Sequence, residues 1–235
     1  DNFVGRQILA VMIEPIKIEF GVSDTAMGLI SGLAFAGVYA LLALPAGRLA
    51  DRMSRTRLLA LACLLWAVAT VLCGLAVSFW MLAVARMAVA VSESPTTSAS
   101  MSIIADLYPP HRRSFAISCF TAAPTFSAVI GLSLGAWVVE HYGWRTAFIV
   151  IGMPALLFST VLAFVAKDPA RGRWDLASAH AAHPLQSLGS EARKLWALPA
   201  YRCLIMAGGL TTLSSYAIGM WNTSFLVRSH GLSLQ

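Results

Sequence analysis

Seven apolar runs, each about as long as a bilayer is thick, constrain this chain more than any other feature. A hydrocarbon core about 30 Å thick requires roughly 20 apolar residues per helix. The runs are continuous, whereas the strands of a closed β-barrel alternate between two faces, so a barrel is excluded. We therefore expect an all-α membrane protein with spans at residues 1–18, 24–47, 58–77, 79–105, 115–139, 144–165 and 200–227.

Composition supports a membrane protein. Hydrophobic residues make up 58% of the 235 residues, and charged residues make up 12%, about half the share of ~25% in a soluble domain. A soluble globule of this size needs a larger polar surface, and a disordered chain needs more charge. The four cysteines lie in apolar stretches, and the spans contain no nucleophile, metal-binding or ATP-binding motif. We therefore expect no enzyme activity, no metal and no cofactor.

The basic residues predict the orientation. The net charge is +6, and cytoplasmic loops carry an excess of Lys and Arg. One side of the predicted membrane holds Lys17, Arg145 and Arg228. The other side holds Arg48, Arg52, Arg55, Arg57, Arg112, Arg113, Lys167, Arg171, Arg173, Arg193 and Lys194. We expect the amino terminus and the long 167–199 loop to be cytoplasmic at the cell inner (plasma) membrane, and we expect no nucleic-acid partner.

A short internal repeat predicts how the spans are grouped. The sequence F-G-V-S-D-T-A follows the first span at 20–26, and H-G-L-S-L-Q follows the seventh at 230–235. If the seventh helix repeats the first, the chain is built from two parallel six-helix halves, which is a transporter architecture. We expect a six-helix bundle at 1–166, a cytoplasmic central loop at 167–199, and the start of a second half at 200–235. Because the chain opens without Met and stops there, we expect it to be part of a longer protein.

The connection between the second and third spans carries the most specific motif, G-R-L-A-D-R-M-S-R-T-R at 47–57. Charge alone also fits a simple basic turn with one balancing acid. The motif resembles the signature loop of the major facilitator superfamily, although Ser54 replaces an inner glycine. The resemblance implies that this loop stabilises one alternating-access state. We assign that gating role to Gly47, Asp51, Arg52 and Arg55, and include Arg112 and Arg113 of the next connection on the same side.

Ionisable residues inside the spans are the candidate transport site. Arg86 and Glu93 are seven residues apart, which places them on one face of a helix. Charges at that depth are costly and usually face a polar cavity or one another. Arg86 also fits a snorkelling side chain, and Glu93 either carries a proton or is a purely structural acid. Pro95 predicts a kink in this span just after Glu93. Arg6, in the first span, either binds an anion or forms a structural ion pair.

A narrower resemblance covers most of the chain up to Gly172. The sequence is similar to the spinster-like branch, which includes lipid carriers, at Asn2 to Ala10, Glu14 to Lys17, Ser23 to Phe35, Arg86 to Glu93, Asp106 to Ser114 and Gly143 to Phe148. Gly5 stands where that branch usually has an aspartate implicated in proton coupling. Asp1 lies four residues earlier on the same helix face and is a candidate substitute. The fourth span also departs from the branch at Ala90 and Ser92.

These observations predict a secondary transporter of a small organic or lipid-like anion that works by alternating access. Proton coupling through Glu93 stays open. The alternatives are a facilitative uniporter of organic anions and a membrane receptor or assembly subunit that transports nothing. We expect the substrate and membrane lipids to be its partners, and a functional monomer once the second half is present.

Overall fold

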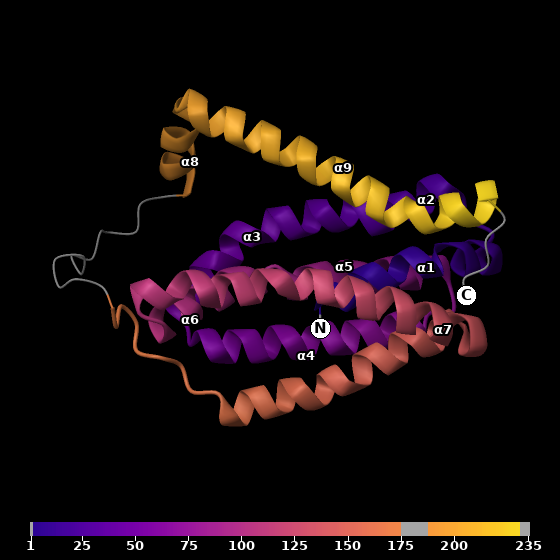
Figure 1. Ribbon diagram of the computed structural model, residues 1–235, viewed down its shortest axis with the longest axis horizontal. Coiled ribbons are helices and arrows are strands. Elements are labelled where there is room, and N and C mark those ends of the chain that lie inside the picture. Colours follow the sequence, from indigo (N-terminus) through magenta and orange to yellow (C-terminus); the bar gives the residue numbers. More distant parts are fainter. Residues whose placement is uncertain (1, 175–187, 231–235) are drawn as a thin grey trace.

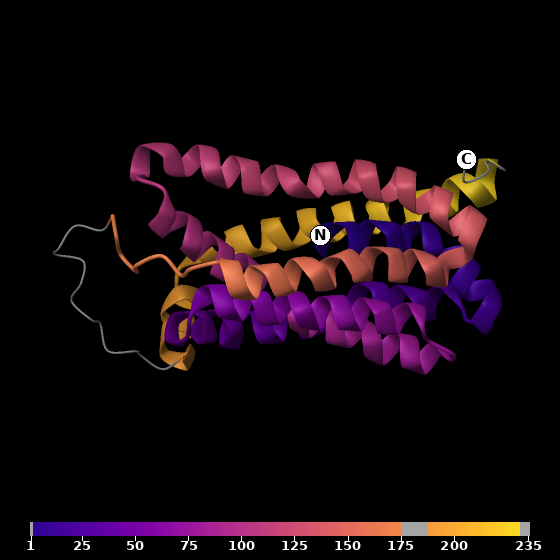
Figure 2. The ribbon, with the colours of Figure 1, turned by 90° about the horizontal axis from the view of Figure 1, so that it is seen from below.

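The computed structural model describes residues 2–174 and 188–230, and helices account for nearly all of them. Long helices lie side by side along one axis (Figures 1 and 2). The all-α prediction is therefore confirmed. The elements in chain order are α1 (Asn2–Phe20), α2 (Asp24–Gly28), the π-helical turn η1 (Leu29–Leu33), α3 (Ala34–Arg52), α4 (Arg55–Gly74), α5 (Phe79–Glu93), α6 (Thr96–Leu107), α7 (Pro110–Val165), α8 (Leu188–Ala197) and α9 (Pro199–His230).

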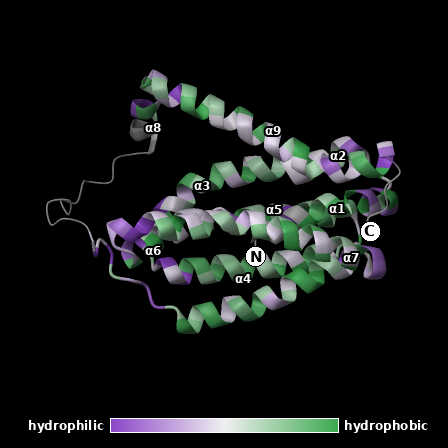
Figure 3. Ribbon diagram, viewed as in Figure 1, coloured by the Kyte–Doolittle hydropathy of each residue, from purple (hydrophilic) through white to green (hydrophobic). Residues whose placement is uncertain are grey.

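Four helical segments among the described residues are long and apolar enough to cross a membrane: Asp24–Arg52, Arg55–Gly74, Pro110–Val165 and Pro199–His230. Apolar residues dominate the middle of the long helices, and hydrophilic residues gather near the ends where helices join (Figure 3). That distribution matches the need to keep charge out of the hydrocarbon layer. The predicted second and third spans correspond to the first two of these segments.

The predicted fifth and sixth spans are the two arms of α7. The helix runs without interruption to Gly143, where a φ of 80° and a ψ of 165° reverse the chain. The second arm then returns alongside the bundle (Figure 1). A positive φ is accessible to glycine at little cost because it has no Cβ. The expected connection between these spans is thus a sharp turn at one residue, and the fifth helix extends past its predicted end at 139.

The predicted fourth span is broken beside its acid. Helix α5 ends at Glu93, and α6 begins at Thr96 after Ser94 and Pro95. Proline has no N–H and cannot continue the hydrogen-bond ladder, so the predicted kink at Pro95 is confirmed. The break changes one expectation, because Glu93 lies at the end of a helix and not in the middle of a regular one.

The predicted central loop contains more structure than its polarity indicates. Residues 188–197 form helix α8 just before α9, and residues 175–187 lie outside the described residues. The loop also begins by packing against the bundle, since Asp168, Pro169 and Arg171 contact the end of α3 and the start of α4. The described part of 167–199 therefore holds one helix and a segment packed against the bundle.

The core lies where α4 packs against α7 and α1 packs against the first arm of α7. Leu9, Met12, Trp66 and Phe148 are almost fully buried there. A Cβ at Gly135 would lie 2.5 Å from Cγ1 of Ile8, so α1 and α7 approach too closely at that position for any other residue. Helix α9 is largely exposed. It contacts α1, lies close to α2 at one end and diverges from α3 toward α8 (Figure 1).

Candidate functional site

A buried ion pair joins α1 to the end of α5. Arg6 donates to Oε2 of Glu93 through Nε at 2.6 Å and also through Nη2. The Glu93 side chain is 2% exposed and that of Arg6 is 20% exposed. In the structure Arg6 thus pairs with an acid, and that acid is Glu93, which the sequence analysis also identified as a candidate site residue. Breaking a buried pair by removing one partner leaves an uncompensated charge, which is strongly unfavourable.

A tryptophan completes the environment of that acid. Trp66 of α4 donates from Nε1 to Oε1 of Glu93 at 3.0 Å, and its side chain is almost fully buried. Its ring lies against Gly5, where an added Cβ would be 3.0 Å from Cζ2. The space beside position 5 is therefore filled by an indole. Asp1, the proposed substitute acid, lies outside the described residues.

Arg86 is a buried cation without a hydrogen-bond partner in the described part of the chain. The residue is 2% exposed, and its Nε has no acceptor. Its guanidinium carbon is 5.0 Å from the centroid of the Phe35 ring, and that of Arg6 is also 5.0 Å from the same centroid. The ring faces attract cations, but they supply no negative charge. The snorkelling alternative does not fit, because Arg86 does not reach the surface.

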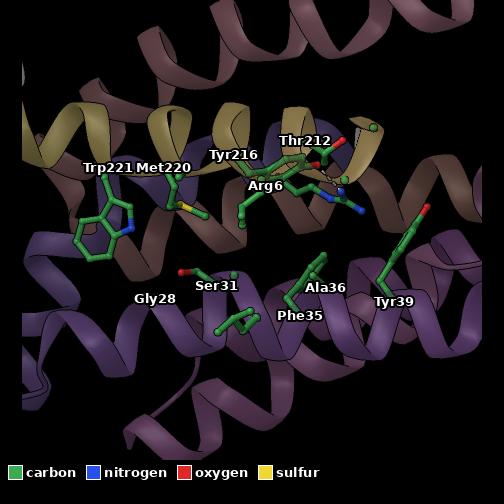
Figure 4. A pocket seen from close by; sticks show the side chains of 16 residues that line it. Arg6, Gly28, Ser31, Phe35, Ala36, Tyr39, Thr212, Tyr216, Met220 and Trp221 are labelled. Atoms are coloured by element: carbon green, nitrogen blue, oxygen red, sulfur yellow. Dashed lines mark hydrogen bonds between the residues drawn. The ribbon is translucent and has the colours of Figure 1, made fainter. Parts of the chain in front are cut away.

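Arg6, Phe35 and Arg86 line two adjoining cavities. The larger, about 620 Å³, lies between α9 and the α2–η1–α3 segment and includes Arg6 (Figure 4). The smaller, about 260 Å³, adds Arg86 and shares Arg6, Ser31 and Phe35 with the first. Tyr216 of α9 accepts a hydrogen bond of 2.8 Å from Nη1 of Arg6. The volume of the larger cavity is in the range of small-molecule sites.

The signature loop is held in place by Arg55. Arg55, 2% exposed, forms ion pairs with Asp106 at the end of α6 and with Asp168 after α7. It also donates from Nη1 to Oγ of Ser102 at 2.8 Å and from Nη2 to the carbonyl of Pro169 at 2.8 Å. Arg55 therefore ties together three segments at one end of the bundle.

A second arginine supports the same loop. Arg171 donates to the carbonyls of Ala50, Asp51 and Met53 at the carboxyl end of α3. A cation is favourable there because helix carboxyl ends carry partial negative charge. Nothing in the sequence motif points to Arg171, since it lies in the central loop.

The other predicted gating residues are less engaged within the described residues. The side chains of Asp51, Arg52 and Arg112 are exposed there. Arg113 donates to the carbonyl of Ala105 at 2.8 Å. A Cβ at Gly47 would meet nothing within 4 Å, so no described neighbour requires glycine at that position.

The opposite end of the bundle carries a charged cluster that joins α9 to α1 and α2. Arg228 donates to Oδ2 of Asp24 at 2.9 Å and to Oδ1 at 2.8 Å, and it also pairs with Glu14. Lys17 pairs with Asp24 as well. The sequence identified Lys17 and Arg228 only as basic residues on one side of the membrane, because the partners of Arg228 lie more than 200 residues away along the chain.

Tyr216 and Trp66 are functional candidates that the sequence analysis did not identify. An aromatic residue in an apolar run carries no distinguishing signal, and only the folded arrangement brings these polar atoms to Arg6 and Glu93. Among the described residues, no three His, Cys, Asp or Glu side chains gather in a way that could hold a metal ion.

Comparison with known proteins gives consistent matches. The family model described as Major Facilitator Superfamily matches residues 2–235. An MFS-type efflux pump of Mycolicibacterium smegmatis is 30% identical over 99% of this chain and 53% of that protein. A probable galactarate/D-glucarate transporter of Bacillus subtilis is 28% identical over 68% of this chain and 36% of that protein.

One solved structure is similar over nearly the whole chain. It is a bacterial homologue of the human lysosomal transporter Spinster in an inward-facing, unoccupied conformation. The TM-score is 0.85 and the sequence identity 30%, covering 99% of this chain and 54% of that one. The chain spans about half the length, or less, of the relatives it matches.

Proposed function

The chain belongs to the major facilitator superfamily and has a spinster-like fold, and from this premise we propose that it forms part of a secondary transporter for a small organic anion. Transport proceeds by alternating access between a six-helix bundle at 1–166 and a second half that begins with α9. The central loop at 167–199 lies on the cytoplasmic side. No step requires an enzyme activity or a cofactor.

The observation that carries the proposal is the unpaired guanidinium of Arg86 beside the Arg6–Glu93 pair. Arg6 and Arg86 carry two positive charges, whereas Glu93 carries one negative charge. A charge buried without a partner is costly, and an anion in the adjoining cavity removes that cost. Carboxylates suit guanidinium groups because two parallel hydrogen bonds can form. A relative whose name gives galactarate and D-glucarate as its substrates supports this choice.

We propose that proton uptake follows from competition for Arg6. An anion that binds Arg6 draws the guanidinium away from Oε2 of Glu93, which then lacks its cation. A carboxylate left without a cation in a low-dielectric site is favoured to take up a proton. Anion binding and protonation of Glu93 are thereby coupled, which is the requirement for a gradient to drive the cycle. Proton and anion move in the same direction in this scheme.

The two ends of the bundle supply the gates. The Arg55 and Arg171 contacts hold the signature loop at the cytoplasmic end, in line with the expected role of Asp51 and Arg52. The cluster of Glu14, Lys17, Asp24 and Arg228 joins α9 to the bundle at the other end. The larger cavity then opens toward the cytoplasm, where α9 diverges from α3.

A lipid-like anion is the second candidate substrate. The larger cavity is lined mainly by apolar and aromatic side chains, including Leu33, Phe35, Met220 and Trp221. Such a lining suits an alkyl chain, with the head group placed at Arg6. A dicarboxylate of a sugar acid needs more polar partners than this lining offers outside the smaller cavity.

The test is uptake by proteoliposomes that contain the purified protein, with no imposed gradient. The panel holds galactarate, D-glucarate, a short sulfonate, a lysophospholipid and one organic cation. We expect saturable uptake of at least one organic anion and none of the cation. Uptake of the lysophospholipid alone would replace the small anion by the lipid-like one. No uptake of any anion would contradict a transport function for this chain's protein.

A further inference from the structure

We propose that Trp66 is a positioning residue for Glu93, and that Gly5 is required to admit its indole ring. The inference rests on the proposed function, because it assigns Trp66 a role in proton coupling through Glu93. Trp66 anchors one carboxylate oxygen throughout the cycle, so that the other oxygen alone exchanges Arg6 for a proton.

The Trp66 ring fills the space beside Gly5. The closest approach to Gly5 comes from the Trp66 ring, at 3.0 Å from an added Cβ to Cζ2. A contact that short can be relieved only if the neighbour moves. Trp66 is 1% exposed and is fixed by its hydrogen bond to Glu93. Any side chain at position 5 therefore requires the buried indole to shift by a few tenths of an ångström, which strains its hydrogen bond to Glu93.

The two carboxylate oxygens of Glu93 accept hydrogen bonds from different residues. Both bonds from Arg6 reach Oε2, whereas the bond from Trp66 reaches Oε1. An indole N–H donates and cannot accept, and it stays neutral whether or not the neighbouring carboxyl group holds a proton. It therefore serves as a partner for Oε1 whether Glu93 is charged or protonated. The proton is directed to Oε2, the oxygen that loses Arg6.

Charged and polar groups from several helices surround the Arg6–Glu93 pair. Arg6 comes from α1 and Arg86 from α5, and Tyr216 of α9 contacts Arg6 from the cavity side. Tyr39 of α3 has its ring centroid 5.2 Å from the guanidinium carbon of Arg6. When Arg6 turns toward a bound anion, Trp66 still holds Glu93 in place. Without Trp66 the carboxylate would be free to move with Arg6 and keep its ion pair. Anion binding at Arg6 would then no longer be coupled to protonation of Glu93.

The first experiment measures thermal unfolding of the purified protein in a double-mutant cycle. We expect Gly5→Ala to lower the unfolding temperature by about 2–4 °C, the shift that a modest loss of stability produces in a domain of this size. In the Trp66→Leu background the same change should cause no loss, because the ring is absent and alanine is a better helix former than glycine. An equal loss in both backgrounds would overturn the steric pairing.

The second experiment measures uptake in proteoliposomes, with galactarate as the probe or the panel anion that the wild type carries. We expect Trp66→Phe to lower accumulation driven by a pH gradient roughly tenfold, the effect of losing a hydrogen bond to a charged group, while gradient-free exchange persists. Trp144→Phe is the matched control. Trp144 is also buried and donates to a glutamate, with 2.8 Å to Oε2 of Glu19, but it lies away from the cavity.

The outcomes separate the two proposals. The ratio of gradient-driven accumulation to gradient-free exchange is compared between the wild type and Trp66→Phe. An unchanged ratio would overturn the role of Trp66 and leave the proposed function intact. Absence of accumulation in the wild type itself would overturn coupling through Glu93 and this inference with it. A loss of the same size in Trp144→Phe would also overturn it, because the effect would then reflect general destabilisation.

Discussion

At the scale of single residues, the apolar interior makes each polar side chain conspicuous. Arg6, Arg86 and Glu93 were predictable because an ionisable residue stands out in an apolar run. Their arrangement was not, since the Arg6–Glu93 pair joins residues 87 apart in the sequence. Trp66 and Tyr216 gave no signal, because aromatic residues are common in such runs and their polar atoms matter only after folding.

Replacing Arg86 should raise the stability of the unliganded protein and lower its affinity for the anion. Arg86→Met removes a buried charge that has no hydrogen-bond partner in the described structure, so we expect the unliganded protein to unfold at a higher temperature. Anion binding should weaken by at least roughly tenfold, because a hydrogen bond to a charged group is lost. Thermal unfolding and titration calorimetry with the transported anion measure the two effects.

The control for this prediction is Arg145→Met. Arg145 pairs with Glu19 at the far end of the bundle, so the change should leave anion affinity unaltered. Unchanged affinity in Arg86→Met would remove Arg86 from the binding site. A lower unfolding temperature for that variant would show that the guanidinium is a structural group.

At the scale of the helices, apolar length predicted where the chain crosses and proline predicted where it breaks. The turn at Gly143 was not evident, because helical sequence continues on both sides and only a positive φ marks the reversal. Helix α8 was hidden in a polar segment. Contacts of Arg171 with α3 were equally unpredictable, since a basic loop residue has no preferred partner in sequence.

The contact of α9 with α1 and α2 supports a prediction at this scale. Arg228→Asp should open that end of the bundle, because Asp24 and Glu14 lose their common cation. The readout is labelling of Ser31→Cys, with the four native cysteines replaced, by a membrane-impermeant thiol reagent. Partly exposed pairs contribute about 0.2–1 kcal/mol each, so we expect labelling from that side to rise by up to roughly fivefold for each of the two pairs lost.

The matched control is Arg228→Lys. It keeps the cation that Asp24 and Glu14 share, so labelling should stay close to its original rate. If Arg228→Lys labels as fast as Arg228→Asp, the charge of the cluster does not act as a gate. Equal labelling in all variants would likewise contradict a closed end held by these charges.

At the scale of the whole molecule, we propose that the chain presents one side of a transport site. The candidate cavities lie between the bundle and α9, and the chain spans about half the length of the relatives it matches. The signature loop and the span count predicted the superfamily, which the comparisons confirm. Chemical identity of the substrate did not follow from the sequence, because a buried arginine binds many anions.

The central claim is that anion transport is coupled to protonation of Glu93, and accumulation in proteoliposomes under an imposed pH gradient tests it most directly. With the anion that the panel identifies, we predict uphill accumulation by the wild type. Glu93→Gln, which keeps the shape of the side chain and cannot exchange a proton, should equilibrate the anion without accumulating it. Accumulation by Glu93→Gln equal to that of the wild type would contradict the account.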